Sequence, residues 1–178
     1  MNIVVIVFAG LTLWVVITYN GFITLGKRAE EAWSDIDVAL KKRWDLVPNL
    51  VAAVKAYASH EKTLFSDVTK ARTQAMGAGS VHEKDVADGK VKDAIGKLIA
   101  VAENYPELRA SENFRTLQTE LTEIEDTIAS ARKYYNGTVR NLNIKIHSIP
   151  DMVVAGLLGI KDREFFEVDE EERNPVGV

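Results

Sequence analysis

Histidine can bind metal ions and act as a general acid or base at neutral pH. The spacing of the histidines in this chain indicates neither a metal site nor a catalytic site. His60-Glu61 resembles the start of a His-Glu-x-x-His zinc helix, yet Leu64 stands where the second histidine is needed. Di-iron bundles use Glu-x-x-His pairs on inward helix faces, and no histidine here follows a glutamate at that spacing. We therefore expect His60, His82 and His147 to be surface or helix-end residues.

Other catalytic patterns are missing as well. Gly77 and Gly79 are not followed by the Lys-Ser/Thr pair of a phosphate loop, and no serine follows the Gly-x of a nucleophile elbow. The chain has no cysteine, which excludes disulfides, thiolate catalysis and cysteine metal sites. Its carboxylates fall on predicted solvent-exposed helix faces. The sequence predicts a protein that is not an enzyme, with no catalytic, metal-binding or cofactor-binding residue and no cofactor.

The composition limits which fold classes and which kinds of partner we expect. The 178 residues carry a formal net charge of −4. Because phosphate binding needs a basic face, we expect no nucleic acid among the partners. Few alternating runs of β-branched residues leave little room for a sheet, so the pattern favours an all-α fold. After an apolar N-terminal segment, about 150 residues remain, which is the size of one domain.

The N-terminal segment is an apolar run, and it determines where the rest of the chain lies relative to a membrane. Ile3 to Leu25 contains no charged side chain, and the run ends at Lys27-Arg28. As a helix it extends about 34 Å at about 1.5 Å per residue, against a hydrocarbon core of about 30 Å. We predict a transmembrane anchor over residues 1–26. A cleaved signal peptide is the alternative, disfavoured because no basic residue begins it and no small-x-small cleavage pattern follows it.

The charges that flank the run predict its orientation. No Lys or Arg precedes it, whereas Lys27 and Arg28 follow at once, and Lys41, Lys42 and Arg43 come later. Positive charge tends to stay on the cytoplasmic side of a membrane. We expect a single-pass protein of the cell membrane with the following domain in the cytoplasm.

Apolar residues spaced three and four apart predict long helices after the anchor. The expected helices cover 29–75, Asp85–Tyr105, and Ser111 to the residue before Pro150. In the first, Pro48 predicts a bend, and the alternative is that one helix ends there and another starts. The glycines within 76–80 predict a turn. The anchor is expected to run into the first helix across Gly21 and Gly26.

Together these elements predict an N-terminal transmembrane helix followed by an elongated antiparallel helical bundle over 27–160, with three long helices and a short fourth. The fourth is the apolar run 152–160, which is too short to span a bilayer. It either caps the bundle or, helped by Phe165-Phe166, enters the membrane interface. Residues 161–178 are expected to form an acidic, mostly disordered tail.

Two charged residues interrupt the apolar seam of the first helix, Arg43 and Glu61. In one interpretation the side chain packs its stem at a bundle edge and keeps its charged head in water. In the other, each residue meets an opposite charge on a neighbouring helix and fixes the register. The sequence leaves both open.

Several strings resemble the LemA family of bacterial membrane proteins. They are Glu31-Ala32-Trp33-Ser34-Asp35-Ile36-Asp37, Pro48-Asn49-Leu50-Val51, Ala100-Val101-Ala102-Glu103-Asn104-Tyr105-Pro106, Asn113-Phe114 and Ala131-Arg132-Lys133-Tyr134-Tyr135-Asn136. The resemblance covers residues 1–167, with Trp44 standing where a small residue is expected. It implies one N-terminal membrane helix, an antiparallel helical bundle, a place in the bacterial inner membrane, and no established catalytic activity or catalytic residue.

The remaining polar residues at helix ends and seams have two interpretations. Asp35, Asp37, Asn49, Asn104, Asn113, Tyr134, Asn136 and Asn143 form either caps and interhelical hydrogen bonds or, in part, a partner-binding groove near the membrane-distal turn. The function expected is that of a membrane-anchored interaction or scaffold module. The alternative is a membrane-remodelling or lipid-engaging protein. Expected partners are the lipid bilayer, membrane or cytoplasmic proteins, and a second copy of the chain.

Overall fold

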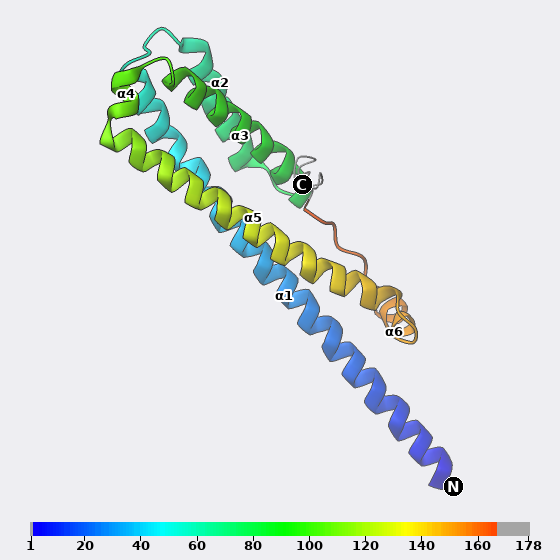
Figure 1. Ribbon diagram of the computed structural model, residues 1–178. Helices are drawn as coiled ribbons and strands as arrows, with labels where there is room; N and C mark the ends of the chain where they lie inside the picture. The colour runs from blue at the N-terminus through cyan, green and yellow to red at the C-terminus, as the bar shows by residue number, and fades with distance from the viewer. Residues whose placement is uncertain (1, 167–178) are drawn as a thin grey trace, which may run out of the picture. The chain divides into compact units, whose positions relative to one another are not determined.

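The computed structural model describes residues 2–166, which form helices and connecting loops without a strand (Figure 1). The helices are α1 (Asn2–Lys55), α2 (Lys62–Gly77), α3 (Val81–Ala102), α4 (Pro106–Ala110), α5 (Glu112–His147) and α6 (Asp151–Leu158). The predicted all-α class is confirmed. The predicted passage of the apolar run into the first bundle helix is confirmed too, because α1 continues without a break through Gly21 and Gly26.

The described chain divides into two compact units, and α1 and α5 each contribute to both. The anchor unit comprises residues 2–34 and 132–165, and the bundle unit comprises residues 35–131 with Phe166. Each unit is described below by itself.

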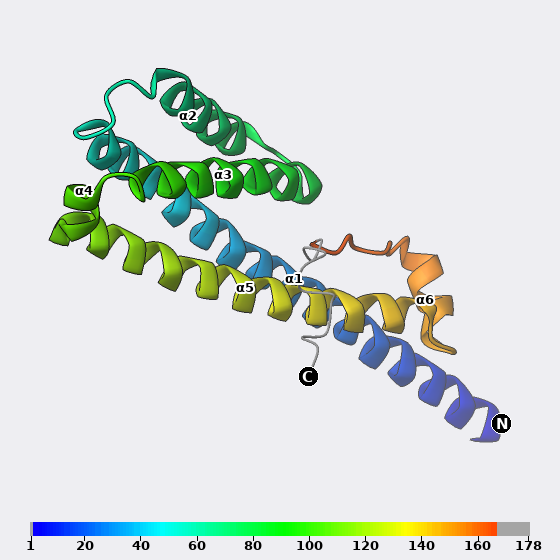
Figure 2. The ribbon, with the colours of Figure 1, turned by 45° about the horizontal axis from the view of Figure 1, so that its top comes forward.

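The bundle unit is built from four longer helical segments that alternate in direction, with the short α4 between α3 and α5. The end of α1, α2, α3 and the start of α5 each run roughly opposite to the segment before, and α2 and α3 lie side by side (Figure 2). All of them supply fully or nearly fully buried apolar side chains, among them Val47, Leu50, Val68, Val91, Leu98, Phe114 and Leu121. Those that share a helix lie three or seven positions apart, which puts them on one helix face, so the predicted seams form the core.

The prediction of one helix over 29–75 is wrong. The chain leaves the helix after Lys55, where Tyr57 and Ala58 both donate backbone hydrogen bonds to the Val54 carbonyl, and it resumes at Lys62. Because the segment 56–61 lacks glycine and proline, the sequence carries no strong signal for this break. The predicted first helix is therefore two antiparallel helices.

Pro48 lies inside α1 without ending it. A proline removes the hydrogen bond to the carbonyl four residues earlier, which here belongs to Trp44. In this protein Arg72 of α2 donates a hydrogen bond from Nε to the Trp44 carbonyl at 2.8 Å. A side chain from the neighbouring helix thus takes the place of the missing backbone donor and removes much of the cost of the proline.

Helix α3 begins with a capping box. The Ser80 hydroxyl accepts a hydrogen bond from the Glu83 amide, and the Glu83 carboxylate accepts from the amides of Gly79 and Ser80. These amide hydrogen bonds lower the pKa of Glu83 below its usual value. The cap places the start of α3 several residues earlier than the predicted Asp85 and confirms the predicted turn over 76–80.

The anchor unit has a thin core beside a largely exposed helix. Phe22 of α1, Leu142 and Ile146 of α5, and Val154 and Ala155 of α6 form one buried cluster, with Trp14, Leu25 and Ile160 packed against it. Helix α6 ends at Gly159, whose φ of 64° suits glycine. The expected short helix near 152–160 is therefore present.

The first part of the predicted tail is held in place. Asn143 exchanges two hydrogen bonds with the backbone of Arg163, at 2.9 and 3.0 Å, and the Tyr135 hydroxyl donates to the Glu164 carbonyl at 3.0 Å. The side chain of Arg163 also pairs with Glu30 at 3.1 Å. Residues 161–166 lack helix and strand but are ordered by these contacts. The rest of the predicted tail, 167–178, lies outside the described residues.

Candidate functional site

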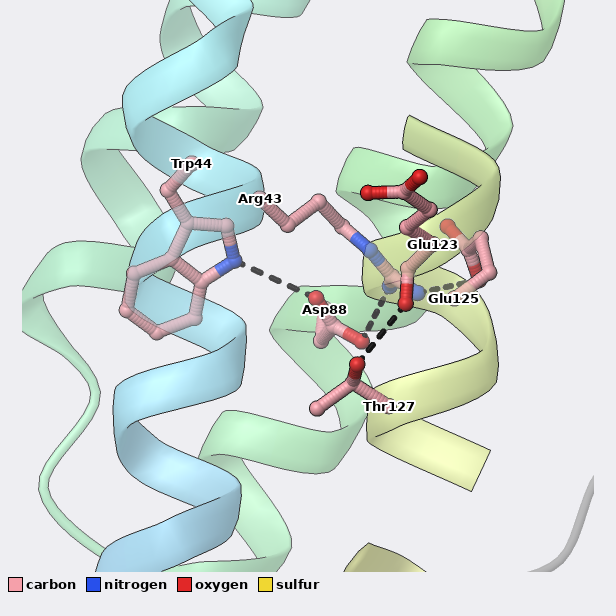
Figure 3. A network of polar contacts seen from close by, with 6 residues as sticks. All are labelled: Arg43, Trp44, Asp88, Glu123, Glu125 and Thr127. Atoms are coloured by element: carbon pink, nitrogen blue, oxygen red, sulfur yellow. Dashed lines mark hydrogen bonds and ion pairs between the residues drawn. The ribbon is translucent and has the colours of Figure 1, made fainter. Parts of the chain in front are cut away.

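A buried charge network crosses the bundle unit (Figure 3). Arg43 of α1 is 1% exposed, and its Nη1 donates to Asp88 Oδ2 of α3 at 2.6 Å, while its Nη2 pairs with Glu125 of α5. Trp44 Nε1 donates to the other Asp88 oxygen at 3.2 Å. Three helices are thereby joined through one guanidinium group.

The geometry of this network fits a structural role better than a catalytic one. Asp88 is 1% exposed, and both of its oxygens accept hydrogen bonds from α1, so neither has a free face toward a substrate. Glu125 is the solvent-facing member, with its side chain 35% exposed. Because a buried guanidinium needs its partners at fixed positions, these contacts fit a role in setting the register of the three helices.

The predictions for the two charged seam residues had different outcomes. The interpretation that Arg43 meets opposite charge on neighbouring helices is confirmed. Glu61 is instead an exposed residue at the start of α2, where its side chain makes no capping hydrogen bond. Trp44, the departure from the family pattern, is buried and holds Asp88, so the larger side chain adds a polar contact as well as volume.

Sequence reasoning missed Asp88 and Glu125 as the partners of Arg43. The sequence does contain a signal that places Asp88 on an apolar helix face. Asp88 lies three residues before Val91, and Ile95 and Leu98 continue the same three-and-four spacing. A carboxylate on an apolar seam requires a cation or donor opposite to it.

The histidines lie at the surface, as predicted. His60 is exposed in the turn after α1, His82 is exposed in the first turn of α3, and His147 ends α5 beside Asp162, at 2.9 Å. Within residues 2–166 no three His, Asp or Glu side chains gather in a way that would hold a metal ion.

The remaining polar residues that the sequence singled out have different surroundings in the structure. Asp37 pairs with Lys84 of α3, and Asn143 holds the segment after α6, which are tertiary contacts. Asn49 and Asn113 instead line a groove of about 560 Å³ in the bundle unit. Its other lining residues come from the end of α1, α4, the start of α5 and the segments that follow α1 and α4: Ala52, Ala53, Ala56, Tyr57, Leu108, Ser111 and Leu117.

A second polar cluster lies in the anchor unit. Lys145 of α5 pairs with Asp151 at the start of α6 at 2.6 Å, and the buried Thr18 hydroxyl of α1 donates to the same carboxylate at 3.1 Å. The hydrogen bond from Lys145 lowers the pKa of Asp151 against the opposing effect of burial. A Cβ at Gly21 would lie 3.0 Å from Lys145 Cε, so glycine leaves room for this side chain.

Comparison with known proteins identifies relatives of this chain. Residues 32–178 match the model of the LemA family. Magnetosome protein MamQ 2 of Paramagnetospirillum magneticum is 30% identical over 175 residues, which cover 84% of this chain and 64% of that protein. Magnetosome protein MamQ of Magnetospirillum gryphiswaldense is 28% identical over 174 residues, covering 83% and 64%. Protein LemA of Metamycoplasma hominis is 27% identical over 145 residues, covering 81% and 66%.

This chain spans about 64% of the length of the MamQ proteins that it matches, and none of these names is that of an enzyme. Among residues 2–166, one helix, α1, is long and apolar enough to cross a membrane. Only 6% of its apolar 18-residue stretch is buried. The family match covers most of the chain, including every residue of the Arg43 network. This membrane-associated, all-α protein therefore belongs to the LemA family.

Proposed function

We propose that this protein is a membrane-anchored, non-catalytic scaffold whose bundle unit binds a segment of a partner polypeptide. The observation that carries the proposal is the groove lined by Asn49 and Asn113. Each amide offers donors and an acceptor that can pair with peptide groups. The alanines Ala52, Ala53 and Ala56 leave room for a second backbone, and Tyr57 adds an amphipathic ring.

The Arg43 network supports this role by making the groove rigid. Helix α1 contributes to both the network and the groove, and α5 contributes Glu125 to the first and Asn113 to the second. A groove held in one shape loses little conformational freedom when a partner binds. Binding energy is therefore available for the contacts themselves.

The proposed location is the bacterial inner membrane with the bundle unit in the cytoplasm, where membrane or cytoplasmic proteins are within reach. Lys27 and Arg28, directly after the apolar run, support this orientation. The chain lacks cysteine, so a single Val86→Cys variant reports the side. We expect a membrane-impermeant maleimide to label it only after cells are opened, and labelling in intact cells would place the bundle outside.

The groove is tested by site-specific photocrosslinking in living cells. A benzophenone amino acid replaces Tyr57 in the groove, and in a matched variant it replaces Tyr134, an exposed tyrosine of the anchor unit. We expect a discrete adduct with one protein at Tyr57 and not at Tyr134. We also expect Asn113→Arg to remove that adduct without lowering the melting temperature, because a bulky cation fills the groove from an exposed position.

Two results would contradict the scaffold proposal. One is the same set of adducts at Tyr57 and Tyr134, which means that contacts follow exposure and not the groove. The other is an adduct at Tyr57 that survives both Asn113→Arg and Asn49→Arg, since two cations in the groove should exclude any segment that docks there.

A further inference from the structure

We infer that α6 is a second membrane-contacting element, whose outer face lies in the lipid leaflet beside the transmembrane part of α1. The inference rests on the membrane anchoring of the proposed function and extends it from one helix to two. It gives the lipid-engaging alternative a definite place in the molecule.

The first observation is that α6 is fixed on the apolar run itself. Val154 and Ala155 are buried against Phe22, with Trp14 and Leu25 packed on the same cluster. The N-terminus of α6 is tied to Thr18 through Asp151. The lipid or water that surrounds residues 14–25 on the α1 face where α6 packs therefore also surrounds α6.

The second observation concerns length. From Ile3 to Ile17 the large apolar side chains of α1 are exposed on nearly all sides, over about 22 Å at about 1.5 Å per residue. A hydrocarbon core is about 30 Å thick, and the uncharged run continues to Leu25, so residues after Ile17 belong to the same apolar span. Those residues include Thr18 and Phe22, which α6 covers. The lipid must then extend along α6.

The third observation is the chemistry of the outer face of α6. Leu157 is 83% exposed, Val153 57% and Met152 48%, and Ile149, two residues before the helix, is exposed as well. Large apolar residues in a cluster are not left in water without a reason. Phe166, which the sequence grouped with Phe165 as an aid to membrane contact, is instead buried.

The charges around α6 complete the argument. Its one carboxylate, Asp151, is paired with Lys145 and accepts from Thr18, so it is not presented to lipid as an isolated charge. No other charged residue occurs from 152 to 160, and Lys161 follows immediately at the end, where a lysine can reach the lipid headgroups. Continuity with the apolar surface of α1 favours lipid over a protein as the occupant of this face.

Nitroxide accessibility in the full chain tests the inference. Single cysteines replace Val153 and Leu157 on α6, Val86 on α3 as a matched exposed valine, and Phe8 in the apolar run. Each variant is spin-labelled in vesicles of phosphatidylethanolamine and phosphatidylglycerol. Collisions with oxygen, which concentrates in lipid, and with a water-soluble nickel chelate are compared. We expect the oxygen-to-nickel ratio at Val153 and Leu157 to approach that at Phe8 and to exceed that at Val86 several-fold.

The outcomes separate this inference from the anchoring on which it rests. A lipid-like ratio at Phe8 together with ratios at Val153 and Leu157 equal to that at Val86 overturns the inference and leaves the anchor intact. A water-like ratio at Phe8 overturns the anchor itself. Protection of Val153 from both reagents, with dipolar broadening between labels, would show that a second copy and not lipid covers α6.

Discussion

The two units of this protein treat charged and apolar side chains in opposite ways. The bundle unit takes Arg43 and Asp88 out of water and encloses them between three helices. The anchor unit leaves Val153 and Leu157 outside, next to a helix whose apolar side chains are also outside. The first arrangement is that of a folded domain interior, where Arg43 and Asp88 have each other as fixed polar partners. The second arrangement fits our proposal that lipid covers this surface, because burying apolar side chains in an apolar medium is favourable.

The largest expected effect comes from breaking the buried network in the bundle unit. Arg43→Met leaves Asp88 buried without its cation, and we expect a loss of about 3–5 kcal/mol in the free energy of unfolding. Urea unfolding followed by circular dichroism in nanodiscs measures it. The double variant Arg43→Met/Asp88→Leu should recover most of the loss. A single variant as stable as the original protein would show that the network is not needed.

The next effect belongs to the anchor unit. Leu157→Asp places a carboxylate on the lipid-facing side of α6, at a cost of up to about 3 kcal/mol for a charge in the membrane. We expect α6 to leave the lipid, so that a nitroxide at Val153 becomes accessible to the nickel chelate. In the bundle unit Val86→Asp should change stability by less than about 0.5 kcal/mol. Equal, small effects of both changes would remove the contrast between the units.

A smaller effect tests how the bundle unit accommodates Pro48. Arg72→Leu removes the donor to the Trp44 carbonyl, and we expect a loss of about 1.5–3 kcal/mol, typical of a hydrogen bond from a charged group. In a Pro48→Ala background the backbone amide of residue 48 supplies that hydrogen bond, so the loss should shrink. A double-mutant cycle measures the difference, and the account of α1 fails if Arg72→Leu costs the same in both backgrounds.

The smallest effect is expected from the ion pair that ties α6 to the anchor unit. The pKa of Asp151 lies below its usual value of 3.8, so the carboxylate stabilises the docked α6 at neutral pH. This contribution is lost as the pH falls through the lowered pKa. We expect Asp151→Asn to cost at most about 1 kcal/mol, because the pair is partly exposed.

The mobility of a nitroxide at Val153 follows this loosening. It should stay constant from pH 7 to pH 5, rise below about pH 4, and be higher in Asp151→Asn at neutral pH. Asp45→Asn, at an exposed pair of the bundle unit, is the control and should leave the label unchanged. A Val153 label that gains mobility above pH 5 would assign the change to another group.

The sequence predicted the parts of the fold that depend on local periodicity. The apolar run of α1, the seams of α3 and α5, the turn over 76–80 and the short α6 all follow from residue spacing. The prediction that the helix continues through Pro48 is confirmed, because the apolar spacing is unbroken there. The sequence could not show that α1 stops after Lys55, where a local signal is lacking, or that Arg72 replaces the missing donor to the Trp44 carbonyl. The partners of Arg43 and the contact of Asp151 with Thr18 join residues far apart in the chain, which spacing alone does not reveal.

Photolabelling by lipid tests the contrast between the two units most directly. The unaltered protein is placed in vesicles that contain a phospholipid with a diazirine in its acyl chain, and the adducts are located by mass spectrometry after irradiation. We predict adducts within residues 3–17 and within 149–158, and none within α2 or α3. Labelling of 3–17 without 149–158, or equal labelling of α2 and α6, would contradict the account.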